Sequence, residues 1–293
     1  MVTLSLTKII HFLKKPENRW FEVLAIIAFL FTLWKLYYNK ETEGFHTELN
    51  ESYSLKQGSD EIYDDFYADL YDYIVTPELC AQEVDAIVQN TQTSVETSIV
   101  LDIGSRNGQT LMEFRRRGYN NVYGIEKHKA MVSHSHEDLM DHVLCAETTD
   151  KMNFERGTFS HVLCLHQSLY DQPDVSIFFQ NCRYWLKPGG VLVLHLVQYQ
   201  KKNPEVAIRI PEKNIKYIRT VEIIEKSVII KETFTDIQTH HVRQQESRPH
   251  YQELDRIINA AVFYGFNLQG KTRISSQVVP PGCTEYLYFL TIS

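Results

Sequence analysis

One apolar run that ends in an acid and two glycines has the residue types and spacing of a ligand-binding loop. Residues 100–108 read VLDIGSRNG, so Asp102, Gly104 and Gly108 follow directly on apolar residues. Glycines let the backbone approach a ligand, and the N-terminus of the next helix offers free N–H groups. Glu126 ends the next apolar run, 22 residues after Gly104. An acid at this separation binds ribose hydroxyls in nucleotide-binding folds, so the pair predicts a site for an adenosine cofactor.

Alternating strands and helices must position these residues. Short apolar runs predict strands at 98–103, 121–125, 142–146, 159–165 and 191–197. Helices are expected over 62–74, 77–90, 109–117, 129–139 and 175–186. The alternation predicts an α/β fold with a doubly wound sheet and right-handed crossovers. Three inserted antiparallel strands (217–224, 227–232, 236–243), a helix (251–264) and a closing strand pair (266–274, 284–292) are expected to follow.

Several motifs resemble those of class I S-adenosylmethionine (SAM) dependent methyltransferases. VLDIGSRNG resembles their motif I and GIEKHKAMV the segment after it, while TFSHVLCLHQSLY, WLKPGGVLVLHLV and GFNLQGK…EYLYFL resemble the later motifs. The likeness covers residues 61–293 and is closest to the type 11 group and to uncharacterised giant-virus-type members. It implies a Rossmann-like sheet of seven strands with an antiparallel last strand. It also implies SAM as cofactor, S-adenosylhomocysteine as product, and inserted strands at about 204–248 over the acceptor site.

The resemblance implies cofactor contacts at Asp102, Gly104, Ser105, Gly108, Glu126, Lys127, Met131, Ala146, Glu147, His166 and Gln167. Asp102 would order the loop, and the next three would meet the methionine part of SAM. Glu126 would bind the ribose, with Lys127 and Met131 near the adenine. Ala146 and Glu147 stand where the family has a Gly-Asp pair, and His166 and Gln167 would border the sulfonium.

Two departures from the family pattern lie in this cofactor site. Arg106 replaces the middle glycine of motif I, so its side chain must point away from the cofactor or impair SAM binding. The Gly-Asp pair is replaced by CAETTD, which leaves Glu147 or Asp150 as the acid. A catalytically degenerate interaction module with the same fold therefore stays an alternative.

Methyl transfer needs alignment of the reacting groups, and a base only where the acceptor carries a proton. His166 is the first candidate for this base, because it directly follows the fourth predicted strand of the sheet. His195 is the second, because ligands of open α/β sheets bind at the carboxyl ends of strands. Tyr71 in IYDDFYADLYDYIV, which resembles the family's lid helix, and Tyr170 could hydrogen-bond an acceptor. For each of these side chains a packing role is the alternative.

Other site chemistries find little support in the sequence. No HExxH, HxxxH or CxxC spacing occurs, so neither a metal site nor a disulfide framework is predicted. A nicotinamide-dependent oxidoreductase would need G-x-G-x-x-G and a second Rossmann half rather than a closing strand pair. The net charge of -7 makes a nucleic-acid partner unexpected. The acceptor is left open between a small molecule, a lipid and a protein.

The N-terminal segment has the composition of a membrane anchor. Residues 1–18 form a basic amphipathic start, 19–38 an apolar span flanked by aromatic residues, and 39–60 a polar linker to the domain at 61–293. A signal peptide would show a shorter apolar core and a small-residue cleavage site, and a buried helix would show a polar face. Basic residues before the span place the domain across the membrane from the cytosol, whereas SAM and reduced cysteines favour the cytosolic side. We expect a single-pass membrane protein with its domain on the cytosolic side.

Overall fold

The computed structural model describes residues 30–32, 52–225 and 227–292. The chain divides into two units, Met1–Glu48 and Leu49–Ser293. Residues 30–32 are helical, and the rest of the predicted span 19–38, with segment 1–18, lies outside the described residues. Among the helices that are described, none has the length and apolarity needed to cross a membrane.

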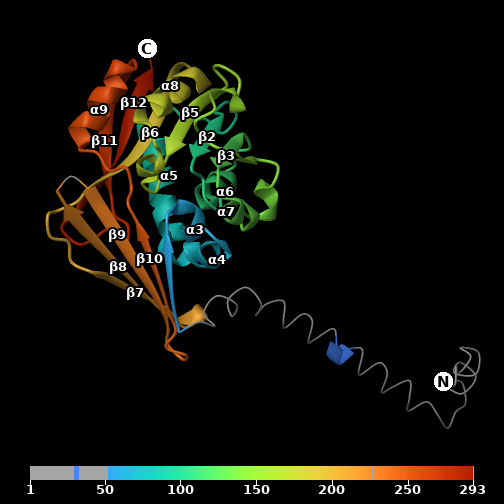
Figure 1. The fold of residues 1–293 in the computed structure, drawn as a ribbon. Helices are drawn as coiled ribbons and strands as arrows, with labels where there is room; N and C mark the ends of the chain where they lie inside the picture. The colour runs from blue at the N-terminus through green and yellow to red at the C-terminus, as the bar shows by residue number, and fades with distance from the viewer. Residues whose placement is uncertain (1–29, 33–51, 226, 293) are drawn as a thin grey trace, which may run out of the picture. The chain divides into compact units, whose positions relative to one another are not determined.

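A seven-stranded sheet forms the centre of the second unit (Figure 1). Its strand order is β11-β12-β6-β5-β2-β3-β4. The strands are β2 (Val100–Ile103), β3 (Val122–Glu126), β4 (Val143–Cys145), β5 (Phe159–Cys164), β6 (Leu186–Gln198), β11 (Phe266–Ile274) and β12 (Thr284–Ile292). β12 is antiparallel to both of its neighbours, while β2 to β6 pair in parallel. The predicted seven-stranded sheet with an antiparallel last strand is confirmed.

Helices cover this sheet on both faces. α6 (Gln109–Arg116) connects β2 to β3, and α8 (Val175–Trp185) connects β5 to β6 in the opposite direction along the sheet. Right-handed crossovers in opposite directions put the two helices on opposite faces. α5 (Pro77–Asn90) packs with α6, and α9 (Leu254–Phe263) packs with α8. The predicted helix 129–139 is shorter, because α7 (Lys129–Ser133) ends before a 3-10 turn at Glu137–Leu139.

A second sheet of five strands has the order β1-β10-β9-β8-β7. Its strands are β1 (Tyr53–Gln57), β7 (Val206–Ile210), β8 (Ile215–Ile224), β9 (Ser227–Asp236) and β10 (Val242–Ser247). The prediction of three inserted strands was therefore incomplete, and the third strand begins at Val242 rather than at Asp236. The predicted linker 39–60 was wrong over Tyr53–Gln57, because this segment pairs in parallel with β10.

Two short helices connect the sheets in place of the single helix predicted over 62–74. α3 (Ser59–Ile62) and α4 (Asp65–Ile74) are separated by Asp64, whose side chain caps α4 by accepting from the Tyr67 N–H at 3.1 Å. The same carboxylate binds the Arg243 guanidinium of β10 at 2.8 and 3.0 Å. This ion pair holds α4, and the tyrosines on its buried face, against the second sheet.

Candidate functional site

The loop between β2 and α6 has the backbone of a ligand-binding turn. Gly104, Arg106 and Gly108 all adopt positive φ, at 71°, 55° and 79°. A Cβ on Gly104 would lie 2.8 Å from the Ser168 side chain, so a glycine is required there. Below the loop, burial raises the pKa of Asp102 to about 7, and its Oδ1 has no hydrogen-bond partner in the described part of the chain. A buried carboxyl group without a partner at Oδ1 suits a site that a polar ligand completes.

Glu126 stands at the carboxyl end of β3, as predicted, and its carboxylate already receives three N–H groups. The backbone N–H of Arg106 donates to Oε2 at 3.1 Å. The backbone N–H and the Nδ1 of His128 approach Oε1 at 2.9 and 2.7 Å. Burial would raise the pKa of Glu126, but the Arg106 charge and the His128 hydrogen bonds outweigh it and lower that pKa to about 2. A carboxylate has about four lone-pair sites, so roughly one stays open for a ribose hydroxyl.

Four predicted cofactor residues line one cavity of about 260 Å³ at the ends of β2, β3 and β4: Gly104, Glu126, Lys127 and Glu147. Ser168 and His128, which the motifs did not single out, line it too. Their oxygen and nitrogen groups suit the polar edges of a nucleoside. The residues present therefore fit the adenosine end of SAM.

The other predicted cofactor residues lie elsewhere. Ser105 and Gly108 lie in the loop, and Ser105 packs against Gly124. Met131 is fully buried, and Ala146 packs against the core cluster beneath α8 and α9. His166 and Gln167 line a second cavity instead. Direct cofactor contacts at these positions stay predictions.

The Arg106 side chain does not point away from the site, although unhindered SAM binding would require it to. Its guanidinium lies over the Tyr63 ring, 4.2 Å from the ring centroid, and forms an ion pair with Asp171. Its Nη1 is also 3.6 Å from Oε2 of Glu126. Arg106 and Asp171 line both the first cavity and the second, so this pair stands at their boundary. A bound cofactor must share Glu126 with Arg106 or shift the guanidinium.

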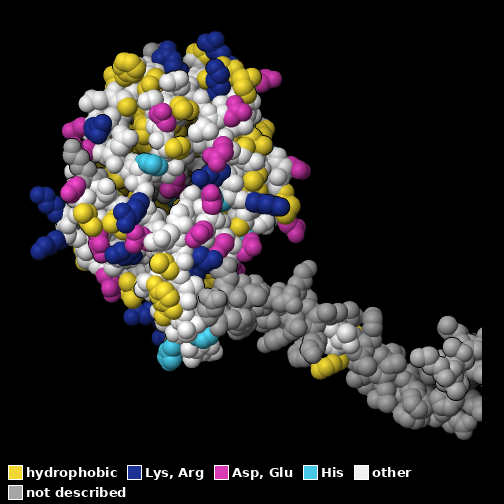
Figure 2. Space-filling model, viewed as in Figure 1, with side chains coloured by type: hydrophobic (Ala, Val, Ile, Leu, Met, Phe, Trp, Pro, Cys, Tyr) yellow, Lys and Arg dark blue, Asp and Glu magenta, His cyan; other side chains and the backbone are white. Residues whose placement is uncertain are grey.

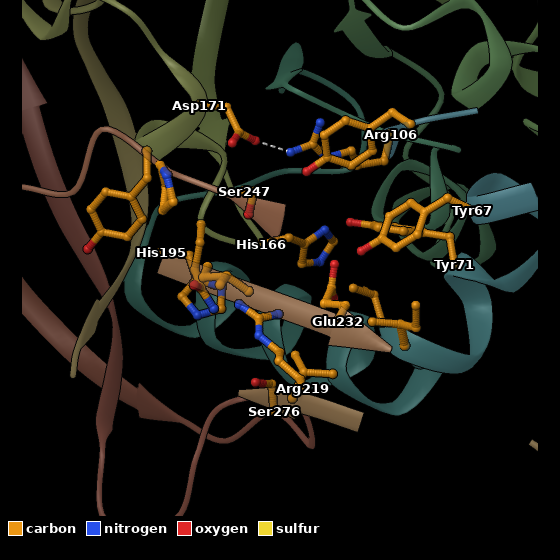
Figure 3. Close-up of a pocket in the computed structure, with 18 of the residues that line it drawn as sticks. Tyr67, Tyr71, Arg106, His166, Asp171, His195, Arg219, Glu232, Ser247 and Ser276 are labelled. Atoms are coloured by element: carbon orange, nitrogen blue, oxygen red, sulfur yellow. Dashed lines mark hydrogen bonds and ion pairs between the residues drawn. The ribbon is translucent and has the colours of Figure 1, made fainter. Parts of the chain in front are cut away.

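The second cavity, of about 90 Å³, lies between the carboxyl ends of the first sheet and the inner face of the second (Figure 3). Tyr67 and Tyr71 enter from α4, His166 follows β5, and Arg219 and Glu232 enter from β8 and β9. The inserted strands thus cover this cavity, as the resemblance implied for an acceptor site.

The predicted catalytic histidines share one buried carboxylate. Glu83 of α5 is fully buried, and its Oε2 is 2.8 Å from His166 Nε2 while its Oε1 is 2.9 Å from His195 Nδ1. The second nitrogen of His195 is 3.2 Å from Glu285 Oε2. Burial would lower the pKa of both histidines, but the carboxylates outweigh it and raise both values, that of His166 well above the ordinary range. Burial would raise the pKa of Glu83, yet the histidines lower it to about 2.

The carboxylates therefore favour the protonated form of both histidines. His195 uses both ring nitrogens on carboxylates, so it has no lone pair for a substrate proton. This geometry does not favour its predicted role as a base, which stays a prediction. His166 keeps Nδ1 without a hydrogen-bond partner in the described chain and lines the cavity, so it can donate there.

The two candidate tyrosines differ in whether their hydroxyl groups are free to bind an acceptor. Burial raises the pKa of Tyr71 well above its ordinary value, so its hydroxyl keeps its proton. The Tyr71 ring meets that of His166 edge to face, with centroids 6.4 Å apart. The Tyr170 hydroxyl donates to the Val197 carbonyl at 3.1 Å and accepts from the Val197 N–H at 3.2 Å. Tyr170 thus anchors β6 and is not free to bind an acceptor.

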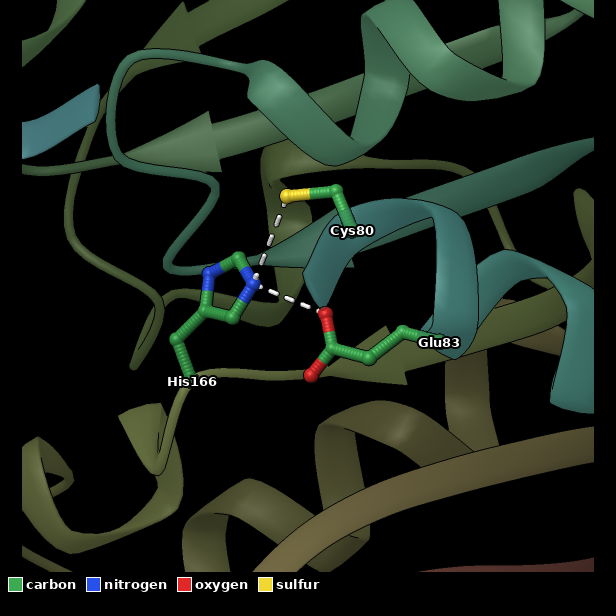
Figure 4. Close-up of side chains that lie close together, drawn as sticks. All are labelled: Cys80, Glu83 and His166. Carbon is green, nitrogen blue, oxygen red and sulfur yellow. Dashed lines mark hydrogen bonds and ion pairs between the residues drawn. The ribbon is translucent and has the colours of Figure 1, made fainter. Parts of the chain in front are cut away.

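Cys80, Glu83 and His166 form a cluster of possible metal ligands that spacing had not indicated (Figure 4). One ligand atom of each lies within 4.8 Å of the others, and Cys80 Sγ is 3.9 Å from His166 Nε2. The contact between His166 and Glu83 has the length of a direct hydrogen bond. The sequence expectation of no metal stays a prediction.

Glu83, Tyr63, Asp171 and Arg219 were not identified from the sequence, although Glu83 left a signal. Glu83 lies on the apolar stripe of α5, with Leu79, Val84 and Ile87. A charged residue on such a stripe needs buried partners. Tyr63 lies between α3 and α4, where the sequence had predicted one continuous helix, and Asp171 lies in the turn after β5, so nothing in the pattern marks them as site residues.

Comparison with known proteins supports the motif assignment. Residues 101–194 match the family model described as a methyltransferase domain, of type 11. A comparison with curated proteins finds no match. The fold is similar to that of an S-adenosylmethionine-dependent methyltransferase from Clostridium acetobutylicum, with 15% identity, a TM-score of 0.60, and coverage of 78% of this chain and 96% of that chain.

Two further structures are similar over nearly their whole length. The CcbJ methyltransferase from Streptomyces caelestis has 14% identity and a TM-score of 0.63, covering 80% of this chain and 100% of that chain. SAM-bound CalS10, an amino pentose methyltransferase from Micromonospora echinaspora, has 17% identity and a TM-score of 0.60, covering 78% of this chain and 96% of that chain.

The closing strand pair β11 and β12 differs from the second Rossmann half that a nicotinamide-binding oxidoreductase would need. Residues 101–194 are a methyltransferase domain, and the sheet around them has the fold of the class I SAM-dependent methyltransferases.

Proposed function

We propose that the chain transfers the methyl group of SAM to a small-molecule acceptor held in the second cavity. The observation that carries this proposal is the shared boundary of the two cavities at Arg106 and Asp171. One cavity holds the ribose acid Glu126, and the other lies under the inserted strands. A donor and an acceptor bound in adjoining cavities meet at their boundary.

The size of the second cavity favours a small acceptor. Its volume of about 90 Å³, at about 10–15 Å³ for each water-sized atom, leaves room for roughly 6–9 non-hydrogen atoms. A lipid or protein acceptor would have to place only its reacting end there. A further cavity of about 460 Å³ adjoins this one at Tyr63, Tyr170 and Asp171 and could hold the remainder.

SAM supplies a methyl group on a positively charged sulfur, and the chain's contribution is chiefly positioning. Gly104, Glu126, Lys127 and Glu147 would hold the nucleoside, with Asp102 below the loop. Alignment of reacting groups can supply up to about 7–11 kcal/mol. The buried rings of Tyr67 and Tyr71 exclude water from the acceptor side.

His166 acts in this proposal as a hydrogen-bond donor. Its raised pKa favours the protonated imidazole, so it orients the acceptor through a lone pair that does not attack the methyl group, instead of removing a proton. A protonated acceptor would release its proton to solvent. An acceptor that reacts as the free base needs no base from the chain.

Calorimetric titration of the full-length protein with SAM, S-adenosylhomocysteine and NAD tests the cofactor assignment. We expect heat with both adenosyl ligands and none with NAD. Glu126→Ala should weaken S-adenosylhomocysteine binding by roughly 10- to 100-fold, because it removes a charged hydrogen-bond acceptor. The exposed Asp138→Asn is the control and should bind normally. No heat with either adenosyl ligand would refute the proposal.

One observation favours a second candidate, a catalytically degenerate module with the same fold. Arg106 occupies a motif I glycine position and reaches Glu126. Such a module would release no S-adenosylhomocysteine with any member of a metabolite panel, whereas the enzyme would release it with at least one.

We further propose that residues 19–38 anchor the chain in a membrane as a single span, with the domain on the cytosolic side. The support is the apolar run and its aromatic flanks. Carbonate extraction should leave the full-length protein in the membrane pellet, and release into the soluble fraction would contradict the anchor. Protection of the domain from external protease in sealed cells or vesicles of known orientation tests the side.

A further inference from the structure

Arg219 is a buried cation on the inner face of the second sheet. Along β8 the buried positions alternate, so Ile215, Tyr217, Arg219 and Val221 share one face. Arg219 is only 9% exposed and lines the second cavity. Figure 3 shows its side chain across the cavity from the Arg106–Asp171 pair. The alternation thus places a charge where the pattern otherwise has apolar and aromatic side chains.

No carboxylate forms a direct ion pair with this guanidinium within the described part of the chain. Its Nε is buried and has no hydrogen-bond partner. Glu232 stands directly opposite on β9, but its oxygens are taken by the Tyr217 hydroxyl and by Gln245 Nε2, the latter at 2.7 Å. No ion pair joins Arg219 to Glu232.

The remaining neighbours of Arg219 are hydroxyl groups. Burial would lower the pKa of Arg219, but Tyr199, Tyr217 and Glu232 outweigh it, so the guanidinium stays charged. The Tyr199 hydroxyl is directed to Gln167 Oε1 at 2.6 Å. Neutral hydroxyls satisfy part of a guanidinium, but its charge is then balanced only by the nearby Glu232, without a direct ion pair.

The other acid of the cavity is not available either. Asp171 is bound to Arg106 on the far side of the cavity. His166 also presents a ring nitrogen to the lining, since Glu83 lies behind it rather than in the cavity. Arg219 therefore lies in the lining beside Glu232, whose oxygens are already hydrogen-bonded, and no carboxylate of the described residues binds its guanidinium directly.

We propose that Arg219 binds an anionic group, a carboxylate or a phosphate, on the methyl acceptor. The inference rests on the proposed function and names the substrate class of that same site. A guanidinium presents a planar fork of donors that matches either group. The anion would supply the direct partner that the buried Nε of Arg219 lacks, and it would hold the acceptor's other end toward the boundary with the cofactor cavity.

The test uses simple probes on the full-length protein. Acetate, inorganic phosphate and the neutral acetamide are titrated calorimetrically, with and without S-adenosylhomocysteine, into wild type, Arg219→Met and Arg219→Lys. The exposed Arg209→Met on β7 is the matched control. We expect an anion to bind wild type and Arg209→Met in preference to acetamide. Arg219→Met should bind it roughly 10- to 100-fold more weakly, with Arg219→Lys in between.

The two anions separate the two sources. Tighter binding of acetate indicates an acceptor carboxylate, and tighter binding of phosphate an acceptor phosphate. Because Arg219→Met could fail to fold, the nitrogen-15 NMR signal of Arg219 Nε–H in wild type, assigned by its loss in Arg219→Lys, gives a second measurement. The signal should shift on addition of the preferred anion.

Each outcome bears on one proposal. An anion affinity that is equal in wild type and Arg219→Met, or an unshifted Arg219 signal at saturating anion, overturns the role of Arg219. If S-adenosylhomocysteine still binds in those samples, the proposed function is retained. Anion binding at Arg219 without any S-adenosylhomocysteine binding would support the anion site and refute the methyltransferase activity.

Discussion

The guanidinium of Arg106 reaches back to Glu126, with Nη1 3.6 Å from Oε2, although the two residues belong to different strand ends. The backbone N–H of Arg106 donates to the same oxygen at 3.1 Å. One residue in a glycine position of motif I therefore engages the predicted ribose acid twice.

Replacing Arg106 with glycine should strengthen cofactor binding. The variant removes the guanidinium that lies 3.6 Å from Glu126 Oε2, and it suits the positive φ of 55°, which glycine adopts without strain. We expect S-adenosylhomocysteine to bind roughly 3- to 10-fold more tightly in calorimetry. The control is Arg116→Gly in α6, whose side chain is exposed. Weaker binding of S-adenosylhomocysteine by Arg106→Gly would instead identify Arg106 as a cofactor contact.

The Glu83 network predicts how stability changes with pH. His166 and His195 have raised pKa values in the folded protein, so the folded chain keeps protons that the unfolded chain loses near pH 6.5. Their contribution is complete below that pH and is lost as pH rises. Stability should thus fall above about pH 6.5, by about 1.4 kcal/mol per pH unit for each retained proton. On the acid side Glu83 contributes above about pH 4.5 and loses its contribution toward pH 2.

Chemical denaturation at several pH values measures this dependence. Glu83→Gln should lower the free energy of unfolding by about 3–5 kcal/mol and flatten the slope above pH 6.5, because it removes the carboxylate of the buried His166 and leaves His195 with Glu285 alone. Glu78→Gln is the control, since Glu78 is exposed on the same helix. An unchanged slope in Glu83→Gln would show that the histidines are not held protonated.

The sequence was sufficient to predict those strands in which nearly every residue is buried. VLDI and FSHVLC are buried at almost every position, so an apolar run identified β2 and β5. β1 was missed because YSLKQ has no fully buried residue, and its pairing partner β10 is far away in the chain. Its strand conformation depends on that partner rather than on its own apolar content.

The site was predictable where a motif fixes a residue's place on a strand end, as for Gly104 and Glu126. It was not predictable where function depends on pairing between elements. The departure at Arg106 was visible in the sequence, but the direction of its side chain was not, because it depends on Asp171 from another part of the fold. His195 was at the correct strand end, but its two carboxylate partners come from α5 and β12.

Surface charge stays consistent with the composition. On the face drawn in Figure 2, basic and acidic side chains are interspersed rather than gathered by sign. The sequence prediction that the chain has no nucleic-acid partner rests on the net charge of -7 and stays a prediction.

We expect the full-length protein to purify with substoichiometric zinc. The His166–Glu83 distance of 2.8 Å is that of a direct hydrogen bond, and His195 already binds the other oxygen of Glu83. Metal analysis after growth in zinc-supplemented medium measures the content, with Cys80→Ser as the paired variant. One equivalent of zinc in wild type that is lost in Cys80→Ser would establish a metal site and contradict this expectation.

Two glycines with nearly the same φ allow the cost of backbone strain to be measured apart from the cost of a steric contact. Gly104 lies in the motif I loop, and Gly189 lies in β6. Gly104 and Gly189 have φ of 71° and 73°, but only a Cβ on Gly104 would meet a neighbour, Ser168 at 2.8 Å. Gly189→Ala should therefore cost only about 1 kcal/mol, for the left-handed conformation. Gly104→Ala should cost about 1–3 kcal/mol more through overpacking and should weaken S-adenosylhomocysteine binding, because this residue lines the cofactor cavity. Thermal unfolding and calorimetry of both variants measure the difference, and equal losses would show that the contact with Ser168 does not shape the loop.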